Sequence, residues 1–279
     1  MQKISQSAWL ARWVLRLGNN VVRRSPIIDL LPPFLARSHR YFYDRRFGRL
    51  QHLRVRKLLS DYWAYDQSIV CASFDYRRFA QYKSLQNRYE SIVREGRVPL
   101  ILDCGANIGM SAYWFATQFP AARVLAVEPD MGNVELARAN NQALPQVRVV
   151  QAAVAPVDCK VSLFNTDKGA DAFRTEMSSE GSIQAYSIGS LLAIAEADPR
   201  DLLIVKIDIE GFEDALFEAN TGWVDMAELI IVEPHDWMIP ASAKANNMLR
   251  ALSRQPRDFL INGEHVLSFR LPDRAAERV

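Results

Sequence analysis

The sequence contains few cysteines, few histidines and no long apolar run. Cys71, Cys104 and Cys159 are widely spaced and follow no metal-ligand or disulfide pattern, as expected in a reducing compartment. No run of about 18 apolar residues occurs, so the sequence predicts no membrane-spanning helix. The N-terminal "MQKISQSAWLARWVLRLG" is not typical of a signal peptide, because Arg12 and Arg16 interrupt its apolar part and no small-residue cleavage site follows. We therefore expect a cytoplasmic protein.

Acidic residues are scarce at the N-terminus, although the formal net charge of the 279 residues is only +2. Residues 1–60 contain 13 Lys and Arg side chains against two acidic ones, whereas the other residues contain 21 against 30. Such a basic arm either binds an anionic partner, such as a membrane surface or a glycolipid, or docks on the acidic body. The arm could alternatively form a lid over a binding site of the body or a dimer interface.

The spacing of apolar residues predicts helices in most of this basic region. Trp9, Trp13 and Leu17 recur at helical spacing and predict an amphipathic helix over residues 8–17, which either packs in the core or lies on a membrane. Residues 41–94 also indicate helices rather than strands. We accordingly expect a basic helical region over residues 1–75 and an α/β domain over residues 76–279.

Apolar β-branched runs alternate with helical segments after Gly96. The expected strands are "VPLILDCG", "RVLAVEP", "VRVVQAAV", "LLIVKID" and "ELIIVEPH", and the expected helices are "MSAYWFATQF", "NVELARANNQA" and "EDALFEAN". Such alternation predicts a doubly wound parallel sheet covered on both faces, with Tyr113, Trp114 and Phe115 packed against it. Asn262-Gly263 between two short runs predicts a C-terminal antiparallel hairpin.

A nucleoside-binding unit is indicated where the first two strands of this domain end. The turn "DCGANIG" contains Gly105, Asn107 and Gly109, and Glu128 ends the next strand, where it can accept hydrogen bonds from ribose hydroxyls. The middle glycine of a dinucleotide G-x-G-x-x-G turn is missing. Asp103 repels a pyrophosphate but suits a ligand with ammonium and sulfonium groups, which favours S-adenosylmethionine over NAD.

The stretches "ILDCGANIGMSAYWFA", "VLAVEPD", "LLIVKIDIEGFEDALF" and "LIIVEPHDW" together resemble the FkbM family of S-adenosylmethionine-dependent O-methyltransferases. The resemblance covers roughly residues 96–240, and K-I-D-I-E-G-x-E is its most specific part. It implies a class I methyltransferase Rossmann-like domain with seven strands, and methylation of hydroxyl groups on sugars, glycans or polyketide-type products. The region before Gly96 lies outside the resemblance.

The resemblance implies that the charged residues of "KIDIEGFE" lie beside the cofactor. Asp208 is expected to point toward the methyl donor, and Lys206 to pair with Glu210 or Glu233. Ala152, at the end of the third strand, is expected near the adenine.

His235 directly follows a core strand and is the candidate general base for the acceptor hydroxyl, unless it only supports its neighbours. Asp236 or Glu233 could fix the imidazole tautomer. Trp237 either contacts a sugar ring or packs in the core.

No metal is favoured by the sequence, although the oxygen-rich set around His235 leaves one open. Asp208, Glu233 and His235, with Glu210 and Asp236, could hold a divalent cation, but carboxylates also gather around a sulfonium without a metal. Two other activities stay open. A nucleic-acid methyltransferase is suggested by the basic arm, but the D/N-P-P-Y/F turn of amino-group methylases is replaced by Asp208-Ile-Glu-Gly. An NAD-dependent oxidoreductase is disfavoured by the missing glycine, and the third alternative is cofactor binding without turnover.

Overall fold

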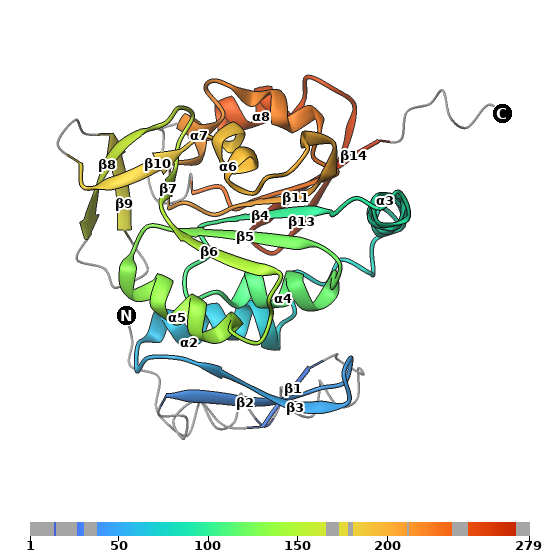
Figure 1. Ribbon diagram of the computed structural model, residues 1–279, viewed down its shortest axis with the longest axis vertical. Coiled ribbons are helices and arrows are strands. Elements are labelled where there is room, and N and C mark those ends of the chain that lie inside the picture. The colour runs from blue at the N-terminus through green and yellow to red at the C-terminus, as the bar shows by residue number, and fades with distance from the viewer. Residues whose placement is uncertain are drawn as a thin grey trace. The chain divides into compact units, whose positions relative to one another are not determined.

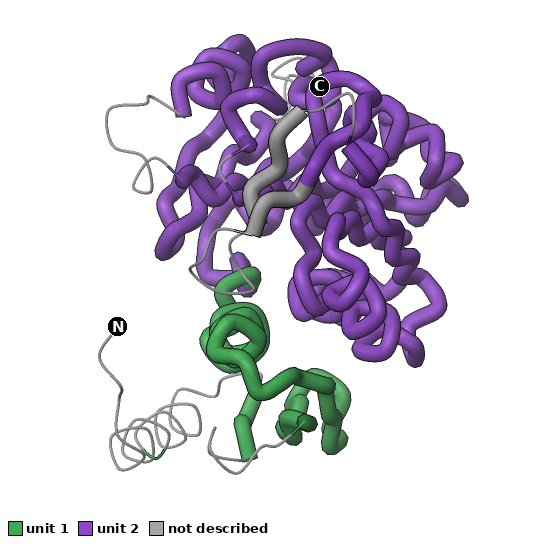
Figure 2. The backbone as a smooth tube through the Cα atoms, turned by 90° about the vertical axis from the view of Figure 1, so that its left-hand side faces the viewer, with its two compact units in different colours: residues 1–74 green, residues 75–279 purple. Residues whose placement is uncertain are grey.

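The structure is a computed structural model that describes residues 14, 27–30, 38–165, 173–177, 181–210, 212–235 and 245–271. The chain divides into two compact units, residues 1–74 and residues 75–279 (Figure 2). Except for the helical Val14, the predicted helix over residues 8–17 lies outside the described residues, as do Asp236 and Trp237. Within the described residues, no helix is long and apolar enough to cross a membrane.

The first unit contains a three-stranded antiparallel sheet in the order β1-β2-β3, followed by an α-helix that continues into a π-helix. These elements are β1 (Ile27–Asp29), β2 (His39–Asp44), β3 (Arg49–Arg54), α2 (Leu59–Tyr65) and η1 (Asp66–Val70). The prediction of helices over residues 41–94 is therefore wrong for residues 41–54, although it holds for residues 59–70 and 82–94.

The strand β2 was missed because its buried face is partly charged. Arg40, Phe42 and Asp44 are buried, while Tyr41 and Tyr43 point outward and are more than a third exposed. Burial thus alternates with the period of a strand, but hydropathy does not, because two of the buried side chains are ionic.

Ion pairs compensate the buried charges of β2. The Arg40 Nη2 atom lies 2.5 Å from Asp29 Oδ2, and the Arg46 Nη2 atom lies 2.6 Å from Asp44 Oδ2. A buried charge without such a partner would be costly, so the pairs permit a strand that a hydropathy pattern does not reveal.

The second unit is built on a seven-stranded sheet in the order β13-β14-β12-β11-β4-β5-β6 (Figure 1). Five neighbouring strands are parallel, and β14 and β13 are antiparallel to their neighbours. The strands are β4 (Leu100–Cys104), β5 (Arg123–Glu128), β6 (Val147–Gln151), β11 (Leu202–Ile207), β12 (Leu229–Val232), β13 (Arg257–Asn262) and β14 (His265–Arg270). This confirms the predicted doubly wound sheet with a C-terminal hairpin, whose two-residue turn is Gly263-Glu264 rather than Asn262-Gly263.

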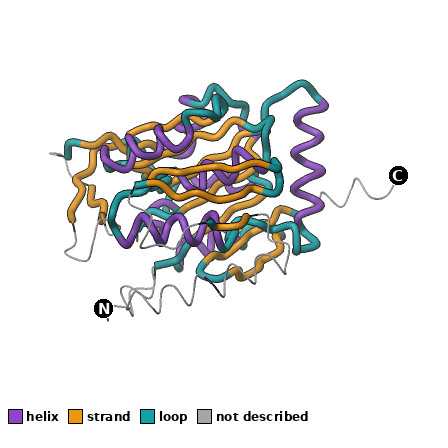
Figure 3. Tube along the Cα trace, turned by 90° about the horizontal axis from the view of Figure 1, so that it is seen from below, coloured by secondary structure: helices purple, strands orange, loops and turns teal. Residues whose placement is uncertain are grey.

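Helices cover both faces of this sheet (Figures 1 and 3). The helices of the unit are α3 (Tyr82–Arg94), α4 (Met110–Gln118), α5 (Met131–Asn141), α6 (Ile188–Ile194), α7 (Glu213–Leu216), α8 (Asn246–Leu252) and the short 3₁₀ turns η2 (Pro199–Asp201) and η3 (Thr221–Asp225). Helices α6, α7 and α8 contribute to one core cluster with alternate residues of the strands. Helix α4 packs on the opposite face, and its residues 110–116 are all buried, which confirms the packing predicted for its aromatic residues.

A second sheet, which the sequence analysis did not predict, interrupts the chain between β6 and β11. Its order is β7-β10-β8-β9, formed by β7 (Ala153–Val154), β8 (Cys159–Asn165), β9 (Phe173–Met177) and β10 (Ile183–Tyr186). The strand β7 begins two residues after β6 ends, so the chain leaves the central sheet at the edge where the nucleoside turn was predicted.

Candidate active site

The glycine turn after β4 is in contact with the end of β11. Gly105 has φ +81°, and a Cβ atom placed on it would lie 1.7 Å from the Asp208 carbonyl oxygen. Only glycine tolerates both this backbone conformation and this approach. The predicted nucleoside turn and the start of the "DIEG" turn are therefore neighbours in space.

Gly109, the second glycine of the turn, packs closely against α5. It also has φ +81°, but a Cβ atom there would lie 2.9 Å from the Ala137 Cα atom on α5. The Asn141 side-chain amide donates a hydrogen bond to the Gly109 carbonyl at 3.0 Å. The second glycine of the turn thus permits close packing between α4 and α5, which fixes where α4 begins.

Glu128 holds the turn from the end of β5. Its carboxylate accepts hydrogen bonds from the backbone N–H of Asn107 (2.9 Å), the backbone N–H of Asp130 (3.0 Å) and the side-chain amide of Asn133 (3.2 Å). Burial raises the pKa of Glu128, and these three donors oppose the shift. The buried Ala152 donates its N–H to the Glu128 carbonyl at 3.1 Å. The predicted cofactor residues Asn107, Glu128 and Ala152 are therefore brought together.

Lys206 contacts residues at the ends of both β4 and β11. Its Nζ atom donates to the Gly105 carbonyl at 2.7 Å and lies 3.1 Å from Asp208 Oδ2 and 3.4 Å from Asp103 Oδ1. Burial disfavours the charged amine, but the negative charges of Asp208 and Asp103 outweigh burial and raise the pKa of Lys206. Asp103 is itself fully buried and accepts a hydrogen bond from the Ser111 hydroxyl at 2.6 Å.

The expected pairing of Lys206 with Glu210 or Glu233 is therefore corrected. That expectation placed Lys206, Asp208 and Glu210 on one face of a continuous strand. The strand β11 ends at Ile207, and Glu210 has φ +57°, so the two-residue periodicity stops before the carboxylates. Lys206 instead pairs with Asp103, its partner in the parallel register of β11 and β4.

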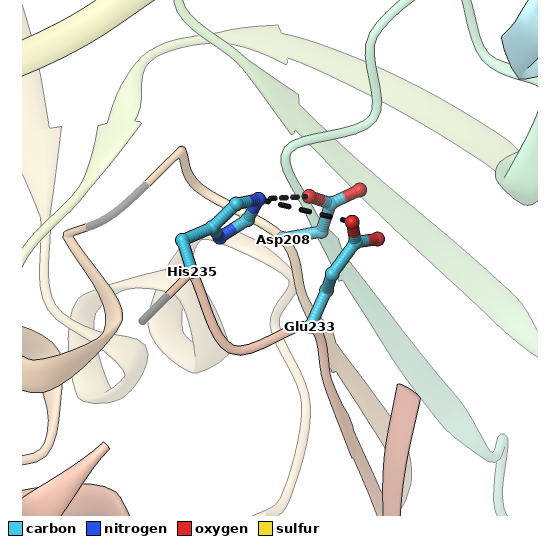
Figure 4. A group of neighbouring side chains, drawn as sticks. All are labelled: Asp208, Glu233 and His235. Carbon is cyan, nitrogen blue, oxygen red and sulfur yellow. Dashed lines mark ion pairs between the residues drawn. The ribbon is translucent and has the colours of Figure 1, made fainter. Parts of the chain in front are cut away.

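His235 lies at the centre of a group of carboxylates beyond the ends of β11 and β12 (Figure 4). Its Nε2 atom is 3.8 Å from Glu233 Oε1, 3.9 Å from Asp208 Oδ1 and 4.0 Å from Glu210 Oε2. The imidazole is buried, whereas the side chains of Asp208 and Glu210 are about a third exposed. The two predicted catalytic residues are thus close neighbours, and Glu233 completes the group.

Glu213 orients the imidazole, and the sequence analysis missed it. Its Oε1 atom lies 2.8 Å from His235 Nδ1 and accepts a hydrogen bond from the Ile209 N–H at 3.1 Å. The expectation that Glu233 fixes the tautomer is therefore wrong, since Glu233 lies on the Nε2 side. Glu213 is the last residue of the "KIDIEGFE" stretch and the first of α7, which is the signal that could have identified it.

The charges around the imidazole shift its pKa upward. Burial lowers the pKa of His235, but the hydrogen bond to Glu213 and the charges of Glu213, Asp208 and Glu210 raise it to about 9. Burial, followed by repulsion from Asp208, raises the pKa of Glu210 to about 8. In this state the imidazole is mainly protonated at neutral pH, so it must lose a proton before it can act as a base.

His265 is a further member that the sequence analysis missed. It begins β14, directly after the hairpin turn, and its Nε2 atom lies 3.6 Å from Glu233 Oε2. The hairpin was predicted, but its position beside β12 depends on the order of the strands in the sheet.

Comparison with known proteins identifies the class of this chain. Residues 103–255, more than half of the sequence, match the model of the methyltransferase FkbM domain. The chain belongs to this family and is therefore a methyltransferase. Members of methyltransferase families generally use S-adenosylmethionine. No curated protein matches the sequence.

Solved structures with a similar fold are methyltransferases at low identity. They include a putative O-methyltransferase from Klebsiella pneumoniae (15% identity, 67% of this chain and 79% of that chain, TM-score 0.38). A methyltransferase from Geobacter sulfurreducens is 18% identical over 76% of this chain and 98% of its own (TM-score 0.34). A putative caffeoyl-CoA O-methyltransferase from Staphylococcus aureus is 14% identical over 76% of this chain and 100% of its own (TM-score 0.38).

Proposed function

We propose that this methyltransferase uses S-adenosylmethionine to methylate a hydroxyl group of a sugar, a glycan or another polyhydroxylated acceptor. The observation that carries the proposal is the backbone contact between Gly105 and Asp208. This contact puts the turn expected to bind the nucleoside next to the imidazole and carboxylates that can activate an oxygen nucleophile. Ligands of open α/β sheets bind at this carboxyl edge.

Residues around the turn suit S-adenosylmethionine. Glu128 is anchored by three donors and keeps carboxylate lone pairs that can accept from ribose hydroxyls. The negative charge at Asp208 supports this proposal, because it attracts the positive sulfonium and ammonium groups of such a cofactor. The backbone along the same edge comes from Gly105, Asn107 and Ala152. Two further residues support this edge: Asp103 pairs with Lys206, and Gly109 fixes where α4 begins.

Methyl transfer requires a nucleophilic acceptor oxygen in line with the carbon–sulfur bond. The oxygen forms a bond to the methyl carbon while the carbon–sulfur bond breaks, and the electron pair of that bond stays on sulfur. The products are a methyl ether, S-adenosylhomocysteine and one proton, which the cluster of Asp208 and His235 receives once the imidazole has lost its own proton. Positioning supplies several kcal/mol of rate enhancement, and proton transfer adds a factor of about 10² to 10⁴.

The cofactor assignment is tested by calorimetric titration of the full chain with S-adenosylmethionine, S-adenosylhomocysteine and NAD. We expect the two sulfur nucleosides to bind, and Glu128→Ala to weaken their binding at least about tenfold through the lost ribose contacts. Glu218→Ala, at an exposed position on the same unit, serves as the control. Absence of binding by both nucleosides would contradict the proposal.

The acceptor class is tested by transfer of a labelled methyl group to a panel of sugars, glycans and nucleic acids. We expect label in a base-stable ether on a sugar hydroxyl. Label recovered only on a base amino group would instead support a nucleic-acid methyltransferase.

The N-terminal region is proposed to contact an anionic membrane surface or glycolipid. The excess of Lys and Arg over residues 1–60 supports this, as do the exposed Tyr41, Tyr43 and Leu50 of the first unit. Salt-sensitive binding of the full chain to anionic liposomes, weakened by Arg12→Glu with Arg16→Glu, is the expected result. Binding that neither salt nor these substitutions changes would contradict it.

A further inference from the structure

We propose that Asp208, Glu233 and His235 bind one divalent cation of the Mn²⁺ type, which holds the acceptor hydroxyl. This inference rests on the proposed function for what the cation does, but the site itself follows from the arrangement of the side chains. The three ligands come from two neighbouring strand ends, Asp208 after β11 and the other two after β12.

The spacing of the three side chains fits a shared ion better than direct hydrogen bonds. His235 Nε2 lies 3.8 Å from Glu233 Oε1 and 3.9 Å from Asp208 Oδ1, and all three ligand atoms lie within 4.8 Å of one another. Hydrogen bonds between nitrogen and oxygen are about 2.7–3.2 Å long. Two ligands at about 2.1 Å from one metal ion are separated by about 3 to 4 Å. Small side-chain movements therefore suffice to bring all three onto one ion.

Two of the three ligands are also held from the side away from the common point. Glu213 Oε1 lies against His235 Nδ1 at 2.8 Å, on the far side of the ring from Nε2. Lys206 Nζ lies 3.1 Å from Asp208 Oδ2, whereas Oδ1 faces the imidazole.

Glu233 has a longer contact on its outer side. Its Oε2 atom lies 3.6 Å from His265 Nε2, whereas Oε1 faces His235. Glu213 and Lys206 thus hold the outer atoms of two ligands, His265 lies beside that of the third, and the three inner atoms converge. Supporting contacts of this kind orient the ligands of protein metal sites.

The chemistry of the donors selects the class of ion. Two carboxylates and one imidazole suit Mn²⁺, with Mg²⁺ favoured by the oxygens and Zn²⁺ by the nitrogen. A cation at this point lowers the pKa of a bound hydroxyl group and fixes its oxygen for attack on the methyl carbon. His235 then serves as a ligand, and the proton of the bound hydroxyl group leaves to solvent beside the partly exposed Glu210, whose Oε2 lies 4.0 Å from Nε2.

The test is titration of chelator-treated full-length protein with MnCl₂, followed by calorimetry and electron paramagnetic resonance. We expect one Mn²⁺ per chain, at least about 30-fold weaker binding in Glu233→Gln and Asp208→Asn, and about tenfold weaker binding in Glu213→Gln. The exposed Glu218→Gln is the matched control and should bind as the wild type does. Thermal melting confirms that each variant is folded, and the Mn²⁺ resonance of the wild type reports nitrogen coordination independently of the variants.

S-adenosylmethionine binding, measured on the same samples, separates this inference from the proposed function. Cofactor binding without Mn²⁺ binding, or with Mn²⁺ binding that Glu233→Gln leaves unchanged, overturns the metal site and leaves the proposed function standing. Mn²⁺ binding that depends on Glu233, without cofactor binding, supports the site and overturns the proposed function.

Discussion

Two groups of carboxylates at the same edge of the sheet are stabilised in opposite ways. At the ends of β4 and β5, Asp103 and Glu128 are buried, and their contacts within the protein are Ser111, Lys206 and three N–H donors. At the ends of β11 and β12, carboxylates face one another across a single imidazole. The protein itself holds the first group in place, whereas the second carries negative charge that a cationic ligand can neutralise.

The largest effect is expected from Lys206, which contacts both groups. Lys206→Met should lower the free energy of unfolding by about 3–5 kcal/mol, because it leaves the buried Asp103 without its cation. Urea denaturation measures this change. The exposed Lys160→Met is the control, with an expected change within about 0.5 kcal/mol. Equal effects of the two substitutions would show that Lys206 does not join the two groups.

The contact between the end of β4 and the end of β11 is tested by a pair of glycines with similar φ angles. Gly105 and Gly263 have φ +81° and +63°, but a Cβ atom meets the Asp208 backbone only at Gly105 and nothing within 4 Å at Gly263. Gly263→Ala should cost about 1 kcal/mol, from the left-handed conformation alone. Gly105→Ala should cost at least about 3 kcal/mol, because a backbone clash is added.

Chemical denaturation of the two alanine variants measures the difference, and a cofactor titration should show weaker binding only for Gly105→Ala. Similar costs for both variants would contradict the close contact between the ends of β4 and β11.

The smallest effect tests the cost of ionising Glu210, whose pKa is raised by burial and by repulsion from Asp208. Because the pKa of Glu210 is raised to about 8 from 4.5, its ionisation destabilises the folded state progressively as the pH rises through this range. Glu210→Gln should therefore stabilise chelator-treated protein by about 1 kcal/mol at pH 9, after allowance for solvent screening, and leave it unchanged at pH 4.

Unfolding curves at both pH values, with Glu218→Gln as control, measure the effect of Glu210→Gln. Addition of Mn²⁺ should abolish the advantage of the variant at pH 9. A destabilising effect of Glu210→Gln at pH 9 without metal would mean that the carboxylates attract a partner within the protein instead of repelling one another.

The elements that could be predicted from the sequence are those whose buried residues form a regular apolar pattern. The parallel strands read as continuous apolar runs because both of their faces are covered, and the glycine turn and the hairpin follow from local backbone requirements. The strand β2 failed this test because Arg40 and Asp44 occupy its buried face as ion pairs. In the sheet β7-β10-β8-β9, which was missed, β7 has only two residues and pairs with β10, Ala153 with Ala185, so no local pattern marks it.

The position of Asp208 and His235 at the carboxyl edge of the sheet was predicted from the sequence alone, since charged side chains directly after core strands of an α/β sheet must lie at this edge. Which atoms meet there was decided only by the tertiary structure. The end of β11 at Ile207 breaks the periodicity that placed Lys206 beside Glu210, and the packing of α7 brings Glu213 to an imidazole 22 residues away. Local propensity sets where a strand ends in the sequence, but the distances between its end and the next depend on strand order and register, which form only when the whole sheet is assembled.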